Sequence, residues 1–338
     1  MAFAKEAAFS VEAVAVELLN DALAQPNSFI LPDLDEKNIY LCNPIHPYAL
    51  IENELQSCED IEYYLIKTET EFIGCITLCY VDSVLMSASL NLDIATQLNE
   101  TCETDDAFQL VANNGLLYIR TAASPIATNG VDTDSTVFAI ASASGHLEVA
   151  TVRSQLTGIV TCPVVPRSSK LLSVPFVPQQ GGTCWAAAGA AFGQYYTGST
   201  YAHYTASDLA SLMGIGIDDG GYIEDTTEML RRYFLINTII VKDRLSDNDA
   251  ITLFQQSKPI IANFHGDVLG TDINIAHMVV LCGYDDGGNG ATIKYYIRDS
   301  NYESVVSVFA YSSDILVMEY YSGQVMFWDE SAYYVYNP

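Results

Sequence analysis

Basic side chains are scarce in this sequence of 338 residues. Lysine and arginine together number 14, against 42 aspartates and glutamates, and the formal net charge is −28. The phosphates of nucleic acids and anionic membrane surfaces repel such a chain, so we expect neither as a partner. The acidic balance fits a secreted or cell-surface protein better than a nucleic-acid-binding one.

Long apolar runs and metal-binding motifs are also missing. No stretch approaches the ~20 uninterrupted apolar residues of a transmembrane helix, so membrane insertion is not expected. Neither a Cys-x-x-Cys pair nor a Cys/His cluster with zinc spacing occurs in the sequence. We therefore expect no structural metal and no cofactor.

The composition supports full hydrophobic cores, with 50% hydrophobic and 17% charged residues. The length suits about two domains. Residues 1–160 contain a first helix followed by short β-type runs, which predicts a small α+β domain with an antiparallel sheet. Residues 161–170, with two prolines and two serines, read as a linker. Residues 171–338 form the second predicted domain.

In the second domain, helices come first and strands follow. This order predicts an α+β fold in which a helical lobe faces an antiparallel sheet. The expected helices are Cys184–Tyr196, Thr205–Met213, Glu224–Tyr233 and Asp247–Gln256. The expected strands are Ile236–Lys242, Pro259–Phe264, His277–Tyr284 and Thr292–Asp299. In the first domain we expect helices Phe9–Leu23 and Asn91–Asn99 and strands Glu62–Lys67, Phe72–Tyr80, Ser83–Leu90, Leu116–Thr121 and Thr136–Ala143.

Residues 174–188 carry the strongest chemical signal. Cys184 follows a Gly-Gly-Thr turn and begins an alanine-rich helix, where the helix dipole and unpaired backbone N–H groups favour a thiolate. A thiolate is the form of cysteine that attacks acyl carbons. Gln179, five positions earlier, can help the Cys184 N–H stabilise an oxyanion, with Gln180 as the alternative.

A nucleophilic cysteine needs a base, and the base needs an orienting group. His203, His265 and His277 are available in the second domain, and His277 begins an apolar strand that can hold its imidazole rigidly. An antiparallel return through the glycine-rich turn would bring Asp299 beside it as orienter. Asn301 is the alternative orienter.

These pieces resemble the papain superfamily of cysteine peptidases. The matching segments span almost all of residues 171–338, and the branch with double-glycine bacteriocin-processing peptidases is the most similar. The segments are 174–179, 184–187, 258–261, 277–285 and 298–300. The resemblance implies a papain-like two-lobed domain with Cys184 as nucleophile, His277 as general base, Asp299 as orienter and Gln179 in the oxyanion hole. Two departures are a glutamine one residue closer to the cysteine and Ala276 in place of a glycine.

The first domain resembles the propeptides of secreted bacterial papain-like zymogens. The resemblance implies an intramolecular inhibitor, with residues 161–170 as activation segment. Arg167 and Lys170, basic residues in an acidic chain, are the candidate cleavage points, and an ordinary surface loop is the alternative for this segment. An accessory domain that binds a substrate or a surface is the alternative.

The sequence thus predicts a thiol endopeptidase that acts on peptide or protein substrates. A papain-fold acyltransferase or amidase for a non-protein substrate is one alternative, because a triad does not dictate its substrate. A non-catalytic interaction protein on the same scaffold is another. Trp185 is expected to pack beneath the site.

Overall fold

Both halves of the chain contribute strands to one large β-sheet in the computed structural model of this protein. The structure describes residues 10–25, 29, 34, 38–51, 54–104, 106–113, 116–121, 125–127, 147–157, 159, 169–201, 203–267, 274–286, 292–311, 316–320 and 324–335. The predicted strand Thr136–Ala143 and residues 161–168 of the predicted linker lie outside these ranges.

The larger sheet has 13 strands. They are β1 (Tyr40–Cys42), β4 (Ile61–Lys67), β5 (Phe72–Val81), β6 (Val84–Asn91), β11 (Val152–Gln155), β12 (Ser169–Leu171), β13 (Thr238–Val241), β14 (Ile260–Asp267), β15 (Asn274–Asp285), β16 (Ile293–Arg298), β17 (Val306–Ala310), β18 (Val317–Tyr320) and β19 (Gln324–Tyr334). The main order is β11-β1-β4-β5-β6-β17-β16-β15-β14-β19-β13, while β12 pairs with β15 and β18 with β19. Every pairing in this sheet is antiparallel.

The two halves meet where β6 pairs with β17. The register runs from Leu90 opposite Ser307 to Ser87 opposite Ala310. The sequence predicts a small domain that merely precedes a two-lobed one, whereas the sheet passes from one half into the other without a break. The physical reason is that the edges of β6 and β17 each present unpaired backbone groups, and each satisfies the other.

A smaller sheet of six strands belongs to the N-terminal half alone. Its strands are β2 (Tyr48–Ile51), β3 (Glu54–Ser57), β7 (Ala107–Asn113), β8 (Leu116–Thr121), β9 (Pro125–Ala127) and β10 (Glu148–Val149). The order is β3-β2-β7-β8-β9, with β10 on β7. The β2–β7 pair is parallel, and the others are antiparallel.

The helices follow the local signals closely. They are α1 (Val11–Leu23), α2 (Asp93–Thr101), α4 (Cys184–Thr197), α5 (Ala206–Met213), α6 (Ile223–Met229) and α7 (Asp247–Gln255), with the short turns η1 (Gly198–Tyr201) and η2 (Leu230–Phe234). Side chains of Ser10, Thr205 and Ser246 accept hydrogen bonds from the first turns of α1, α5 and α7. The helix predicted at Glu224–Tyr233 is divided, because η2 continues α6 as a wider π-type turn.

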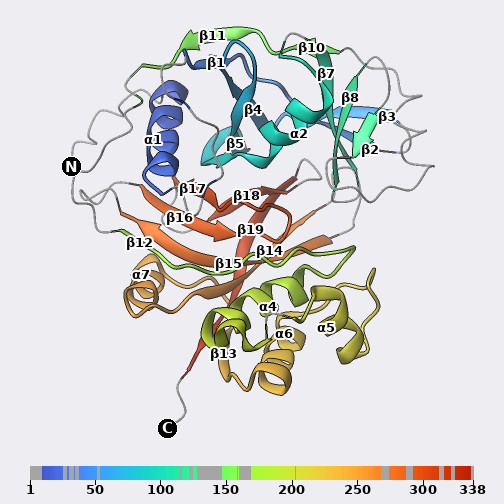
Figure 1. The fold of residues 1–338 in the computed structure, drawn as a ribbon, viewed down its shortest axis with the longest axis vertical. Helices are drawn as coiled ribbons and strands as arrows, with labels where there is room; N and C mark the ends of the chain where they lie inside the picture. Colours follow the sequence, from blue (N-terminus) through green and yellow to red (C-terminus); the bar gives the residue numbers. More distant parts are fainter. Residues whose placement is uncertain are drawn as a thin grey trace.

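The C-terminal strands lie between two groups of helices. Figure 1 shows α4, α5, α6 and α7 on one side of β14 and β15, and α1 on the other side, next to β16 and β17. An ion pair joins Lys294 of β16 to Asp21 of α1, and Lys294 Nζ is 3.3 Å from Asp285 of β15. The Gln25 amide donates to the Tyr296 hydroxyl at 3.1 Å. The N-terminal half therefore packs on the sheet face that the α4 group leaves open.

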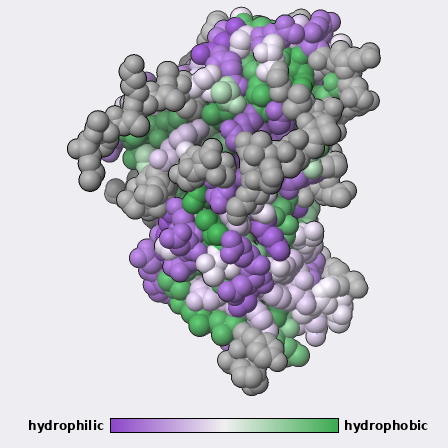
Figure 2. Space-filling view, turned by 90° about the vertical axis from the view of Figure 1, so that its left-hand side faces the viewer, coloured by the Kyte–Doolittle hydropathy of each residue, from purple (hydrophilic) through white to green (hydrophobic). Residues whose placement is uncertain are grey.

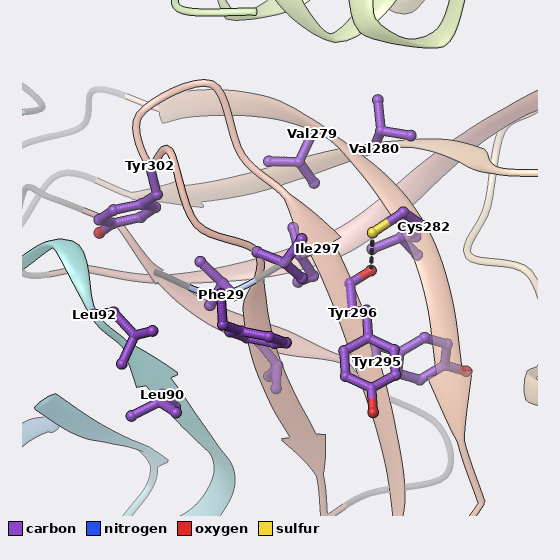
Figure 3. Packing of buried hydrophobic residues seen from close by; sticks show 14 of the residues in the cluster. Phe29, Leu90, Leu92, Val279, Val280, Cys282, Tyr295, Tyr296, Ile297 and Tyr302 are labelled. Atoms are coloured by element: carbon purple, nitrogen blue, oxygen red, sulfur yellow. Dashed lines mark hydrogen bonds between the residues drawn. The ribbon is translucent and has the colours of Figure 1, made fainter. Parts of the chain in front are cut away.

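One hydrophobic cluster runs through both halves. Figure 3 shows Phe29, Leu90 and Leu92 of the N-terminal half alongside Ile297 and Tyr302 of the C-terminal half. On the face drawn in Figure 2, hydrophilic residues are spread over both halves among apolar ones. No helix in the described ranges is both long and apolar enough to cross a membrane.

The end of the predicted linker is part of the sheet. Ser169 and Lys170 belong to β12 and lie opposite Asp285 and Tyr284 of β15. Glycine is required at position 283, because a Cβ there would be 2.1 Å from the Lys170 carbonyl oxygen. Of the residues predicted as an accessible connector, these two are therefore fixed by strand pairing.

Candidate active site

A glycine-containing turn sets the position of Cys184 at the start of α4. Gly181 has a φ of +56°, and a Cβ there would lie 2.7 Å from the Ile217 carbonyl oxygen, so only glycine fits without strain. The buried Thr183 hydroxyl donates to the Gln180 carbonyl at 2.8 Å and accepts from the Gln180 N–H at 3.0 Å. This turn leaves Cys184 as the first helical residue, with its side chain half-buried.

Small residues allow α4 to lie close to its neighbours. Gly189 faces Met229 and Gly193 faces Phe234, at distances where a Cβ would clash. Trp185 is fully buried and packs against Gly221, and its carbonyl accepts from the Thr226 hydroxyl at 3.2 Å. The expectation that Trp185 packs beneath the cysteine agrees with this burial.

His277 lies on β15 and contacts both other predicted members of the triad. Its Nε2 is 2.9 Å from Asp299 Oδ1, and the two side chains are 0% and 1% exposed. Cys184 contributes to the electrostatics of the same imidazole, so its side chain is close to the ring. Since Nε2 faces the carboxylate, the other ring nitrogen, Nδ1, is the one available to the sulfur.

The environment strongly favours the charged form of this imidazole. Burial alone would lower the pKa of His277, but the charge and the hydrogen bond of Asp299, together with the contact of Cys184, raise it from 6.5 to about 10. The imidazole at the centre of the site is therefore protonated at neutral pH.

Strand pairing explains why Asp299 meets His277. Val280 of β15 lies opposite Arg298 of β16, so Asp299, the next residue, comes level with Val279, two positions from His277 along β15. Asp299 Oδ1 also accepts the backbone N–H of Asn301 at 2.9 Å. Asn301, the alternative orienter, thus meets Asp299 through its backbone.

The structure separates the two candidate glutamines. Gln179 Oε1 accepts the Ser300 hydroxyl at 2.7 Å, and Gln179 Nε2 is 3.3 Å from the Gly181 carbonyl. Gln180 Oε1 instead accepts the hydroxyl of Ser207 on α5 at 2.8 Å. Gln179 is therefore the glutamine tied to the segment that carries Asp299.

Arg298 and Ser300 belong to the matching segment 298–300, but the sequence-based argument gave neither of them a role. Ser300 orients the Gln179 amide, and Arg298 donates through Nε to the Val174 carbonyl at 3.2 Å and through Nη1 to the Glu303 carbonyl at 2.6 Å. Both flank Asp299 directly in the sequence, and this position within the matching segment 298–300 is the signal that could have identified them. They connect the Asp299 turn to the chain that leads to Cys184.

The other two candidate bases lie elsewhere. The exposed His203 packs its ring against Tyr204, with centroids 4.3 Å apart. His265 of β14 pairs through Nδ1 with Asp329 Oδ1 at 2.7 Å. Across the ranges that the structure describes, no group of three or more His, Cys, Asp and Glu side chains is arranged to hold a metal ion.

Comparison with known proteins bears on the same part of the chain. Residues 171–321 match the model of the Peptidase_C39 like family, which supports a cysteine peptidase family for this region. Fourteen chains of solved structure match, and one of them is described as a C39-like peptidase from Bacillus anthracis. That protein has 18% sequence identity and a TM-score of 0.35, and the alignment covers 50% of this chain and 98% of that chain. No curated protein matches.

Proposed function

We propose that this protein is a thiol endopeptidase with a Cys184–His277–Asp299 triad. The observation that carries the proposal is the buried hydrogen-bonded pair of His277 and Asp299, beside the half-buried Cys184 at the start of α4. The raised pKa of His277 keeps its imidazole charged at rest, and a charged imidazole beside the sulfur favours nucleophilic attack. Asp299 fixes the ring orientation and stabilises its charge.

In the proposed reaction the Cys184 thiolate attacks the carbonyl carbon of the scissile peptide bond. The resulting oxyanion accepts hydrogen bonds from the Cys184 backbone N–H and from Gln179 Nε2. The imidazolium of His277 gives its proton to the departing amine, which leaves a thioester. His277 then takes a proton from water, and the hydroxide releases the acid product and the thiolate.

The Gln179 contacts support its part in this scheme. Because its Oε1 already accepts from Ser300, the amide is oriented with the nitrogen as its free end. That nitrogen has two N–H groups, and the one contact at 3.3 Å with the Gly181 carbonyl is long. One donor therefore remains for an oxyanion.

Selective alkylation of Cys184 tests the proposal. At neutral pH, iodoacetamide is expected to label Cys184 at least ~100-fold faster than the other described cysteines, because a thiolate reacts and a thiol does not. Burial raises the pKa of Cys42 and Cys102 to about 11 and that of Cys282 to about 12, so these remain protonated. Peptide mass spectrometry measures each rate. Labelling of Cys184 no faster than of Cys102 contradicts the proposal.

The two glutamines provide a matched pair of variants. Gln179→Ala is expected to lower kcat for peptide hydrolysis by ~10²–10³, the typical effect of losing one oxyanion donor. Gln180→Ala removes only the contact with Ser207, so its kcat should stay within about twofold of the wild type. Equal losses in the two variants would refute the assignment of Gln179.

The role of the N-terminal half as an intramolecular inhibitor stays a prediction. It requires that cleavage within residues 161–170 and departure of the N-terminal half raise activity. The β6–β17 pairing would hold the two parts together after such a cut. The contacts between the halves also suggest the opposite role, in which the N-terminal half supports activity instead of inhibiting it.

A further inference from the structure

Residues 298–304 form a connecting segment that contains Asp299 and contacts both His277 and Gln179 of the proposed site. Asp299 contacts His277, and Ser300 contacts Gln179. Arg298 bridges the Val174 and Glu303 carbonyls. A shift of this segment would therefore displace the orienting carboxylate and the glutamine together.

A carboxylate from the N-terminal half holds the far end of the same segment. Asp93, at the start of α2, accepts the Glu303 backbone N–H through Oδ2 at 2.5 Å. It also accepts hydrogen bonds from the backbone and the side chain of Ser304. The three donors are adjacent in the chain, so one carboxylate fixes the whole end of the turn.

Packing on both sides makes this contact rigid. Leu92 and Tyr302, the residues just before Asp93 and Glu303, belong to the same buried cluster and lie with Phe29 between the halves (Figure 3). Beyond the turn, β17 pairs with β6, the strand that leads into α2. The position of Asp93 is thus fixed by two buried side chains and a strand pair.

We propose that Asp93 is a positioning residue of the active site, through which the N-terminal half holds Asp299 against His277. This inference rests on the proposed peptidase function. It makes the N-terminal half a part of the working enzyme: weakening its contact with residues 303–304 lowers activity, whereas weakening an inhibitor's contact would raise it.

The test uses full-length Asp93→Ala, Asp93→Asn and Asp93→Glu. In Asp93→Ala we expect kcat to fall about 10- to 100-fold, the scale of a misplaced catalytic group, with KM nearly unchanged because Asp93 does not touch substrate. Asp93→Asn keeps an acceptor oxygen and should recover part of kcat. Asp93→Glu keeps the charge but lengthens the side chain, so it tests whether the distance from the carboxylate to residues 303–304 matters as well. If Asp93→Ala does not fold, the other two variants decide.

The matched control is Glu12→Gln. Glu12 is also a carboxylate in the first turn of an N-terminal helix, but it binds Arg153 within its own half. Its loss is expected to leave kcat unchanged. Thermal unfolding of every variant shows whether a general loss of stability accompanies any loss of activity.

A second measurement is independent of catalysis. The imidazole proton between His277 and Asp299 should give a downfield NMR resonance, which Asp93→Ala shifts or broadens and Glu12→Gln leaves in place. An unchanged resonance together with unchanged kcat overturns the inference, and so does a rise in kcat, which favours the inhibitor. If the wild type hydrolyses no peptide and Cys184 resists labelling, the proposed function fails, while the resonance still decides the role of Asp93.

Discussion

Replacement of Cys184 by alanine should lower peptide hydrolysis by at least ~10⁴-fold. Without the sulfur no thioester can form, and removal of a catalytic nucleophile costs far more than removal of a supporting group. The fold should survive, because the side chain is only half-buried and alanine suits the helix that it begins. The loss is measured as hydrolysis of a general protein substrate such as casein, monitored through the amino groups that cleavage releases.

Self-cleavage provides a second measurement with the same variant. If residues 161–170 are an activation segment cut by the enzyme itself, mass spectrometry after storage will find fragments of the wild type and none of Cys184→Ala. The control is Cys102→Ala, which removes a half-buried thiol from the N-terminal half. Full hydrolysis by Cys184→Ala would refute the assignment of the nucleophile.

Asp299→Ala should move the alkaline limit of activity. In the wild type the charged imidazole of His277 protonates the leaving amine, so activity should fall as the pH rises through its pKa of about 10. Without the carboxylate, burial is no longer opposed and lowers the pKa, so the limit should move to lower pH by about 2 units or more. The pH profile of kcat measures this shift.

The control for that shift is Asp329→Ala. Asp329 also pairs with a histidine, His265 on the neighbouring strand β14, but through Nδ1, and it is half-exposed and outside the proposed triad. Its loss should leave the alkaline limit in place. Equal profiles for the wild type and Asp299→Ala would show that His277 does not depend on Asp299.

The pair of His277 and Asp299 also makes the stability of the fold depend on pH. The folded-state pKa of His277 is raised above its usual 6.5, so the pair contributes fully to the free energy of unfolding below about pH 6.5. That contribution is lost as the pH rises towards 10. Asp299→Ala should therefore lose more stability at pH 6 than at pH 10.

Short-range signals in the sequence predicted much of the catalytic region. Thr205 and Ser246 cap their helices, and α4 begins at Cys184, as the sequence predicts. The contact between His277 and Asp299 follows from the pairing of β15 with β16, two strands that a glycine-rich stretch of the sequence separates. Such features depend on neighbours within a few residues or across one turn, which is what sequence patterns encode.

Long-range features were out of reach. Nothing in the sequence of β6 indicates that its partner is β17. The strands β7 and β17–β19 have no sequence pattern that distinguishes them from loops. The role proposed for Asp93 depends on that pairing, because only the folded sheet brings it to Glu303. The choice between Gln179 and Gln180 likewise required the positions of Ser300 and Ser207.

The β6–β17 pair also orders events during synthesis. Leu90 and Ser307 are 217 positions apart (307 − 90), so the ribosome releases β6 long before its partner exists. Contacts this distant form slowly, and the open edge of β6 can pair with other chains in the interval. Because Asp299 lies just ahead of β17, we expect the triad to assemble only after the chain as far as β17 has emerged. Until then Cys184 would be inactive, so the nascent chain would not hydrolyse nearby proteins, and no cleavage event would be needed to prevent it.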